Sequence, residues 1–105
     1  MVVSFEKEYL RDLYETGKTA DKKYRFQPEI VRKYRLCIGL MRRVPDTSAL
    51  AKYNGLNFKN LKGDKAGISS IRVNKQYRIE FTVTANDVEP LVTICSIIEL
   101  SNHYK

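Results

Sequence analysis

The sequence predicts a single α+β domain, in which an N-terminal strand and two helices pack on a mainly antiparallel, twisted sheet. The chain has 105 residues, which is enough for one hydrophobic core and too few for a second domain. Apolar residues recur with helical spacing in the first half, whereas the alternation typical of strands fills the second half. Strands and helices do not alternate after the first elements, so a parallel α/β sheet is not expected.

The first strand and the first helix are expected at the beginning of the sequence. Residues 1–5 form a short apolar run, which predicts a strand. In residues 6–17 the apolar side chains fall on one face of a helix, and Gly17 favours its end. These side chains are Tyr9, Leu10 and Leu13. Residues 18–26 are polar without a clear period, which predicts a connection or a fragment of helix.

The clearest helix is expected over residues 27–43. Pro28 suits the first turn, and apolar residues follow at steps of three and four. This stripe consists of Ile30, Tyr34, Cys37, Ile38 and Met41. Pro45 ends the helix, and Asp46 is suited to cap another short turn that continues to Tyr53.

Two later regions predict strands. Residues 68–83 read ISSIRVNKQYRIEFTV and contain a hairpin, whereas residues 91–100 read LVTICSIIEL. Because the last strand is apolar on both faces, we expect it in the interior of the sheet rather than at an edge.

The alternating residues of the hairpin predict its register. Side chains directly opposite one another in an antiparallel pair share a face. A two-residue turn would place Ile71 opposite Arg78, whereas a three-residue turn at 74–76 places Ile71 opposite Ile79. The apolar pattern therefore favours the longer turn, which also places Arg72 opposite Arg78.

Two arginines that face one another repel unless an anion lies near them. Two interpretations are open on this pattern alone. Glu80 lies diagonally across and could neutralise the arginines, as in an ordinary surface ion network. Alternatively, the two guanidinium groups form a phosphate clamp, because the arginine fork matches phosphate oxygens.

Composition narrows the functional classes. The formal net charge of +7 favours a polyanionic partner. Nucleic acid is the first candidate and an acidic protein surface the second. The alternative is that the surface is basic without binding a polyanion. Cys37 and Cys95 lie far apart in apolar runs, which predicts buried thiols in a reducing compartment. No signal-peptide region and no run of about 20 apolar residues is present, so we expect a cytoplasmic protein without a membrane partner.

The sequence also narrows the chemistry. His103 is the single histidine, so a centre built from several histidines is excluded. Gly63 and Gly67 lack the Lys-Ser/Thr that follows a P-loop, and the carboxylates are scattered. The remaining lysines, arginines, tyrosines and histidine can cut RNA without a cofactor, because the ribose 2′-OH is itself the nucleophile. His103 and Tyr104 are the candidates for general acid and base.

The segment LKGDKAGISSIRVNKQYRIEF resembles the HigB branch of the RelE/ParE toxin superfamily. That branch typically shows Leu-Lys-Gly-Asp-x-x-Gly, then Ser-Ile-x-Val, a polar turn and aromatic-Arg-Ile-x-Phe. Here these motifs occupy residues 61–67, 70–73 and 77–81. The MVVSF start and the order of elements also match, so the resemblance covers nearly the whole chain and implies a RelE-like fold.

The resemblance implies a toxin of a type II toxin-antitoxin system that cuts mRNA in the ribosomal decoding site and inhibits translation and growth. It also implies a cognate antitoxin, HigA-like and carrying a helix-turn-helix. By position, Lys62 and Arg78 match basic residues of the superfamily's active surface, and Arg72 matches a basic strand position. Lys59 stands where some HigB-type toxins have a catalytic histidine.

The C-terminal residues depart from the family pattern. HigB-like chains often end in Asp-Tyr-His, whereas here histidine and tyrosine follow Asn102 in the exchanged order. Because successive strand residues alternate faces, the exchanged order need not preserve the geometry. Further residues are expected to contact the substrate: Lys65, Lys75, Tyr77 and Asn102. The alternatives are a ParE-like gyrase poison on the same fold and a non-catalytic module that binds RNA or the antitoxin.

Overall fold

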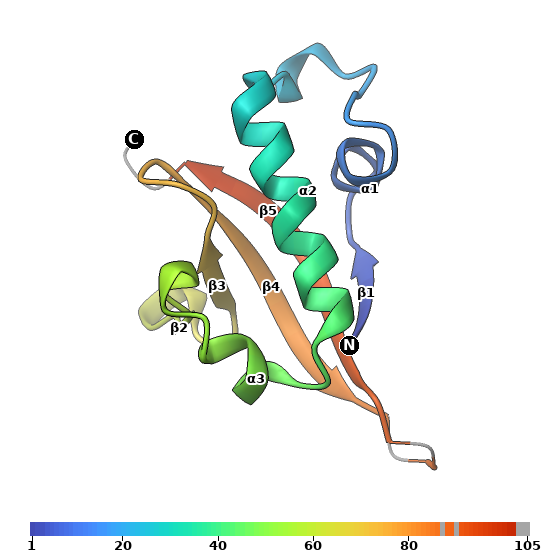
Figure 1. Ribbon diagram of the computed structural model, residues 1–105, viewed down its shortest axis with the longest axis vertical. Coiled ribbons are helices and arrows are strands. Elements are labelled where there is room, and N and C mark those ends of the chain that lie inside the picture. The colour runs from blue at the N-terminus through green and yellow to red at the C-terminus, as the bar shows by residue number, and fades with distance from the viewer. Residues whose placement is uncertain (87, 90, 103–105) are drawn as a thin grey trace.

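The computed structural model describes residues 1–86, 88–89 and 91–102. Along the chain, a strand and two main helices precede a short third helix and four further strands, as Figure 1 shows. The elements are β1 (Val2–Phe5), α1 (Glu8–Glu15), α2 (Pro28–Arg43), α3 (Thr47–Ala51), β2 (Lys59–Asn60), β3 (Ser69–Arg72), β4 (Tyr77–Ala85) and β5 (Thr93–Asn102). Single 3₁₀ turns lie at Lys22–Tyr24, Asn54–Leu56 and Gly63–Lys65.

The five strands form one mostly antiparallel sheet in the order β1-β5-β4-β3-β2. β5 runs parallel to β1, with Val2 opposite Ile94, and antiparallel to β4. β5 is thus an interior strand, which confirms the position expected from its two apolar faces. A register shift after Glu80 marks a bulge between β4 and β5.

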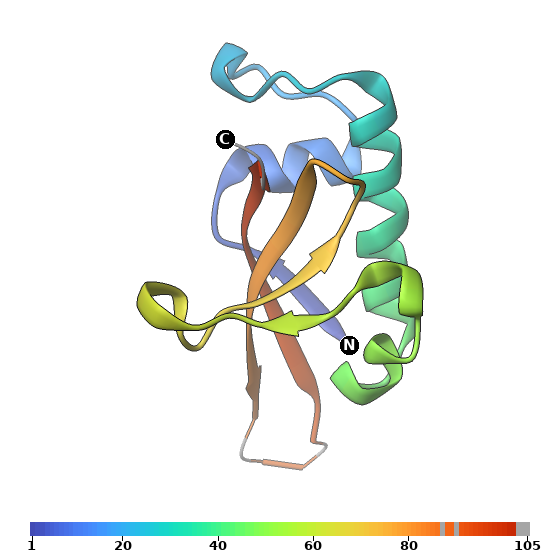
Figure 2. The same ribbon diagram turned by 90° about the vertical axis from the view of Figure 1, so that its left-hand side faces the viewer.

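The helices α1 and α2 cover one face of the sheet, and the hydrophobic core lies between these helices and that face (Figures 1 and 2). α2 begins at Pro28 and buries the predicted stripe together with Val31, while α1 buries Tyr9, Leu10 and Leu13. Each large apolar side chain that is fully buried contributes about 1.5–3 kcal/mol relative to an exposed one. The sheet contributes Ile71, Ile79, Phe81, Cys95, Ile97 and Leu100 to this core, and Val73, directly after β3, adds to it.

The predicted cap at Asp46 and the predicted burial of the two cysteines agree with the structure. The Asp46 carboxylate accepts a hydrogen bond from the Ala49 backbone N–H at 2.9 Å, so it caps α3 as expected. Cys37 and Cys95 are buried free thiols, and burial raises the pKa of each to about 11. Within the described residues, no helix is long and apolar enough to cross a membrane.

Candidate functional site

The β3–β4 hairpin has the register that the alternating residues predict. Ile71 lies opposite Ile79, and Arg72 lies opposite Arg78. The three-residue turn is held by the Asn74 side chain, whose Oδ1 accepts hydrogen bonds from the backbone N–H groups of Gln76 (2.9 Å) and Tyr77 (2.7 Å). An asparagine suits this position because its side chain hydrogen-bonds backbone groups two or three residues on.

The two arginines lie on the face of the sheet opposite the helices. Strand alternation directs Ile71 and Ile79 into the core under α2, so Arg72 and Arg78 point away from it. Ser70 shares their face, and Lys59 lies opposite Ser70 on the edge strand β2. We call the surface formed by Lys59, Ser70, Arg72 and Arg78 the arginine face.

Arg78 is the most firmly held residue of the arginine face. Its Nε donates to Ser70 Oγ at 2.9 Å, and its Nη2 donates to the backbone carbonyl of Asn57 at 2.7 Å. Asn57 adopts a left-handed backbone conformation (φ 46°) at the end of the 3₁₀ turn that precedes β2. Only 8% of Arg78 is exposed, so its guanidinium group is held in an almost fully buried position.

Arg72 is more open, and its contacts leave its outer nitrogens available. Its Nε donates to the Asn74 carbonyl at 3.2 Å. Among the described residues, neither Arg72 nor Arg78 forms a salt bridge with a carboxylate. The pKa of Arg78 is lowered, first by burial and then by the neighbouring positive charge of Arg72. The pair therefore places a buried and a partly exposed positive charge close together, an arrangement that a bound anion would stabilise.

Glu80 does not neutralise the arginines in the way that one sequence interpretation allowed. Its carboxylate, almost fully buried, pairs with the Lys65 Nζ at 2.8 Å. This hydrogen bond raises the pKa of Lys65 above its ordinary value. Lys65 comes from the 3₁₀ turn before β3 and reaches across that strand to Glu80 on β4. The interpretation in which Glu80 forms an ion pair with the arginines is not borne out, because its carboxylate pairs with Lys65; its charge nevertheless acts on Arg78 and opposes the lowering of that pKa.

The other predicted site residues divide into three groups. Lys62 and Lys75 are exposed in the turns that flank β3. Tyr77 lies on the helix-side face, where its ring packs edge-on against Phe26 at 5.5 Å, and Asn102 lies opposite it on β5. The structure therefore does not bring Tyr77 to the arginine face. His103 and Tyr104 lie outside the described residues.

Sequence reasoning missed two residues that position Arg78. Ser70 could have been found, because it has the same strand parity as Arg72 and therefore shares its face. The Asn57 carbonyl could not, since a backbone group 21 residues away carries no sequence signal. Within the described residues, no three His, Cys, Asp or Glu side chains cluster as metal ligands would.

The fold matches that of a solved bacterial toxin. The YoeB/ParE toxin from Agrobacterium tumefaciens superimposes with a TM-score of 0.58 over 99% of this chain and 100% of that chain, at 21% sequence identity. This likeness defines a RelE-like toxin fold and confirms the predicted fold class. No curated protein sequence matches the chain.

The family follows from the sequence match. The model of the HigB-like toxin family, described as RelE-like toxins of type II toxin-antitoxin system HigB, matches residues 3–93. The chain belongs to the HigB-like toxin family, which confirms the resemblance drawn from residues 61–81. Toxins of type II systems pair with an antitoxin, and the family match does not favour the ParE-like gyrase alternative.

Proposed function

We propose that this chain is a ribosome-dependent endoribonuclease, which cuts mRNA without a metal ion and thereby stops translation and growth. The observation that carries the proposal is the Arg72–Arg78 pair, two arginines at opposed positions on one face of the sheet that form no salt bridge with a carboxylate in the described structure. An RNA phosphodiester, or the more highly charged phosphorane formed from it, is the kind of group that relieves their repulsion. The family assignment supports the same activity.

The proposed reaction needs proton transfer and charge stabilisation. The ribose 2′-oxygen attacks the adjacent phosphorus and loses its proton to a general base. The bond from phosphorus to the 5′-oxygen breaks, and that oxygen takes a proton from a general acid, which leaves a 2′,3′-cyclic phosphate. The outer nitrogens of Arg72 hold the phosphate oxygens as charge develops, and the neighbouring charge of Arg78 adds positive potential.

Lysines and the C-terminal residues complete the proposed site. Lys59 of the arginine face and Lys62 in the turn before β3 are exposed and add positive potential, while Lys65 is paired with Glu80. His103 and Tyr104, beyond the described residues, are proposed as the general acid and base. The ribosome is proposed to orient the RNA, since the arginine face supplies donors for a single phosphate. A cytoplasmic location is proposed with this activity, because translating ribosomes are its proposed target.

The test is growth and mRNA integrity after induced expression without antitoxin. The variant Arg72→Gln removes an outward-facing charge, and Arg25→Gln, at an exposed position far from β3 and β4 in the sequence, is the matched control. We expect wild type and Arg25→Gln to arrest growth with mRNA cut at defined codon positions. Arg72→Gln should cut about 100-fold more slowly, as expected for loss of one transition-state donor worth about 3 kcal/mol.

Other outcomes would replace the proposal. Growth arrest with intact mRNA would indicate a different target, such as gyrase. No arrest by a folded wild-type protein would indicate a binding module. Full cleavage by Arg72→Gln would show that the arginine pair is not the phosphate site.

A further inference from the structure

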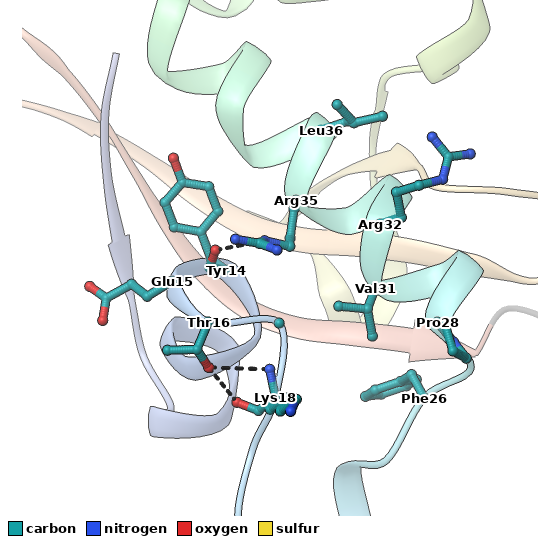
Figure 3. Close-up of a pocket in the computed structure, with 11 residues that line it drawn as sticks. Tyr14, Glu15, Thr16, Lys18, Phe26, Pro28, Val31, Arg32, Arg35 and Leu36 are labelled. Atoms are coloured by element: carbon teal, nitrogen blue, oxygen red, sulfur yellow. Dashed lines mark hydrogen bonds between the residues drawn. The ribbon is translucent and has the colours of Figure 1, made fainter.

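The two faces of the sheet offer different kinds of surface. On the helical side, a groove of about 920 Å³ runs between the end of α1 and the first half of α2, with Phe26, Pro28 and Val31 in its lining (Figure 3). An apolar lining of this kind suits an apolar occupant. The face that carries Arg72 and Arg78 instead presents charged and hydroxyl side chains, which suit the phosphates and base edges of RNA.

A second row of charged side chains crosses this face next to the arginines. Glu80 follows Arg78 by two residues on β4, so the two side chains share a face, and Glu99 lies directly opposite Glu80 on β5. Lys65 pairs with Glu80 at 2.8 Å, and the Lys7 Nζ lies 3.6 Å from the Glu99 carboxylate. We call Lys65, Glu80, Glu99 and Lys7 the charged row.

The two carboxylates of the charged row differ in how fully their hydrogen-bonding capacity is used. Like charges directly opposite one another destabilise a sheet, so each carboxylate needs a donor. Glu80 is almost fully buried and accepts a hydrogen bond from Lys65. Of the Glu99 side chain 41% is exposed, and its separation from Lys7 is too long for a hydrogen bond. Because such an exposed ion pair contributes little, a ligand that donates hydrogen bonds to Glu99 can replace Lys7.

Lys65 supplies a donor beside this acceptor. Half of its side chain is exposed, and its ammonium group has three hydrogens, of which Glu80 accepts one. The hydrogen bond to Glu80 is the main cause of the raised pKa of Lys65, and the charge of Glu99 raises that pKa further. The ammonium group therefore lies near both carboxylates. The charged row thus presents a donor and an open acceptor on one exposed surface.

The separation of Glu99 from the arginines suits a single nucleotide. Arg72 and Glu99 differ by two strand spacings and by two residues along the strands, so their Cα atoms lie about 12 Å apart. Glu99 is then too far to remove a proton beside a phosphate on Arg72, because a general base must lie within hydrogen-bond reach. An extended nucleotide can span this gap, since its base projects away from its phosphate on the far side of the ribose.

We propose that the charged row is a base-recognition site, in which Glu99 and Lys65 bind the Watson–Crick edge of a guanine whose phosphate lies on the arginine face. This inference rests on the proposed nuclease function and gives it a sequence preference. The Glu99 carboxylate accepts hydrogen bonds from guanine N1–H and N2–H, and the Lys65 ammonium donates to O6. Adenine and cytosine offer a carboxylate only their exocyclic amine, and uracil offers only N3–H. Guanine alone has donors at two adjacent positions of this edge.

The experiment measures binding of nucleoside 3′,5′-bisphosphates to the purified full-length chain by NMR titration. These probes carry a phosphate on either side of the ribose, so a base on either side of the bound phosphate is sampled. We expect the guanosine compound to bind about tenfold more tightly than the adenosine, cytidine and uridine compounds, as one bidentate contact to a base provides. Amide shifts are expected at residues 72, 78 and 99.

Glu99→Gln should remove most of the guanosine preference, because its amide keeps one acceptor and replaces the other by a donor. It should not lower the melting temperature, since it removes a loose ion pair and also the repulsion of Glu80. The matched control Glu89→Gln changes an exposed carboxylate between β4 and β5 and should retain the preference. Arg72→Gln should weaken all four compounds by a similar factor, because phosphate contacts carry no base preference.

Three results would overturn the inference. They are equal binding of the four compounds, a guanosine preference that Glu99→Gln retains, and no binding of any compound. The cut positions in mRNA give a second readout: cuts beside guanine that spread to other bases in Glu99→Gln would support the inference. Cuts that do not depend on Glu99 would contradict it alone, whereas intact mRNA would contradict the proposed nuclease function, so the two failures are distinguishable.

Discussion

The two arginines of the site should differ sharply in what they contribute to stability. Arg78 makes three hydrogen bonds in an almost fully buried position, to Ser70 Oγ, the Asn57 carbonyl and the Ser70 carbonyl (3.4 Å). Replacing it by glutamine leaves these acceptors partly unsatisfied. Bonds from a charged donor contribute about 1.5–3 kcal/mol each, offset by the cost of burying the charge, so we expect a net loss of about 2 kcal/mol.

Arg72→Gln should have almost no effect on stability. It removes one hydrogen bond to the Asn74 carbonyl and also the repulsion of Arg78. Each contribution is on the order of 1 kcal/mol, and their signs are opposite, so the unfolding free energy should stay within about 0.5 kcal/mol of wild type.

Urea unfolding of purified wild type, Arg72→Gln and Arg78→Gln tests this difference. With an m-value of about 1.5 kcal/mol per M, a loss of 2 kcal/mol lowers the midpoint by about 1.3 M. Arg25→Gln, at an exposed position, is the control for removing an arginine charge. If Arg78→Gln unfolds at the wild-type midpoint, or if Arg72→Gln proves the less stable variant, the assigned roles of the hydrogen bonds are refuted.

Three further predictions concern the anion site, the pH dependence and the core. We expect inorganic phosphate to bind the arginine face with a Kd of about 10 mM. At 50 mM it should then raise the melting temperature of wild type by about 4 °C, relative to chloride at equal ionic strength. Arg72→Gln should lose this effect. Burial raises the pKa of Tyr9 from 10.0 to about 12. The stabilisation that neutral Tyr9 gives the folded state is therefore complete below pH 10 and is lost as pH rises towards 12. Tyr9→Phe should therefore flatten the alkaline fall in unfolding free energy, measured by urea unfolding at several pH values. Phe81→Ala empties a fully buried position against Phe58 and should cost about 3–5 kcal/mol in the same assay.

Local periodicity was sufficient to predict the framework of the arginine face. The opposition of Arg72 and Arg78 follows from strand parity alone, because a slip of one residue would have placed charge in the core. The same parity places Tyr77 with Ile79 on the helix side, so its position was also available from the pattern. The interior position of β5 was predictable from its two apolar faces.

Tertiary contacts account for what the sequence could not show. The turn before β2 brings the Asn57 carbonyl to Arg78, and the turn before β3 brings Lys65 to Glu80. Both contacts join irregular segments to the sheet, and the sequence of an irregular segment has no periodicity from which such a contact could be predicted. The groove beside α2 likewise arises from packing of α1 against α2, whereas periodicity describes each helix alone.

The pairing of β1 with β5 determines how late in synthesis the sheet that carries the arginine face can be completed. Val2 meets Ile94, so the sheet joins residues from opposite ends of the described chain, and such long-range pairing slows folding. During synthesis β3 and β4 emerge before β5, and a lone hairpin is at best marginally stable. The arginine face therefore becomes rigid only after almost the whole chain has left the ribosome. The proposed nuclease is thus incomplete while its own message is being read.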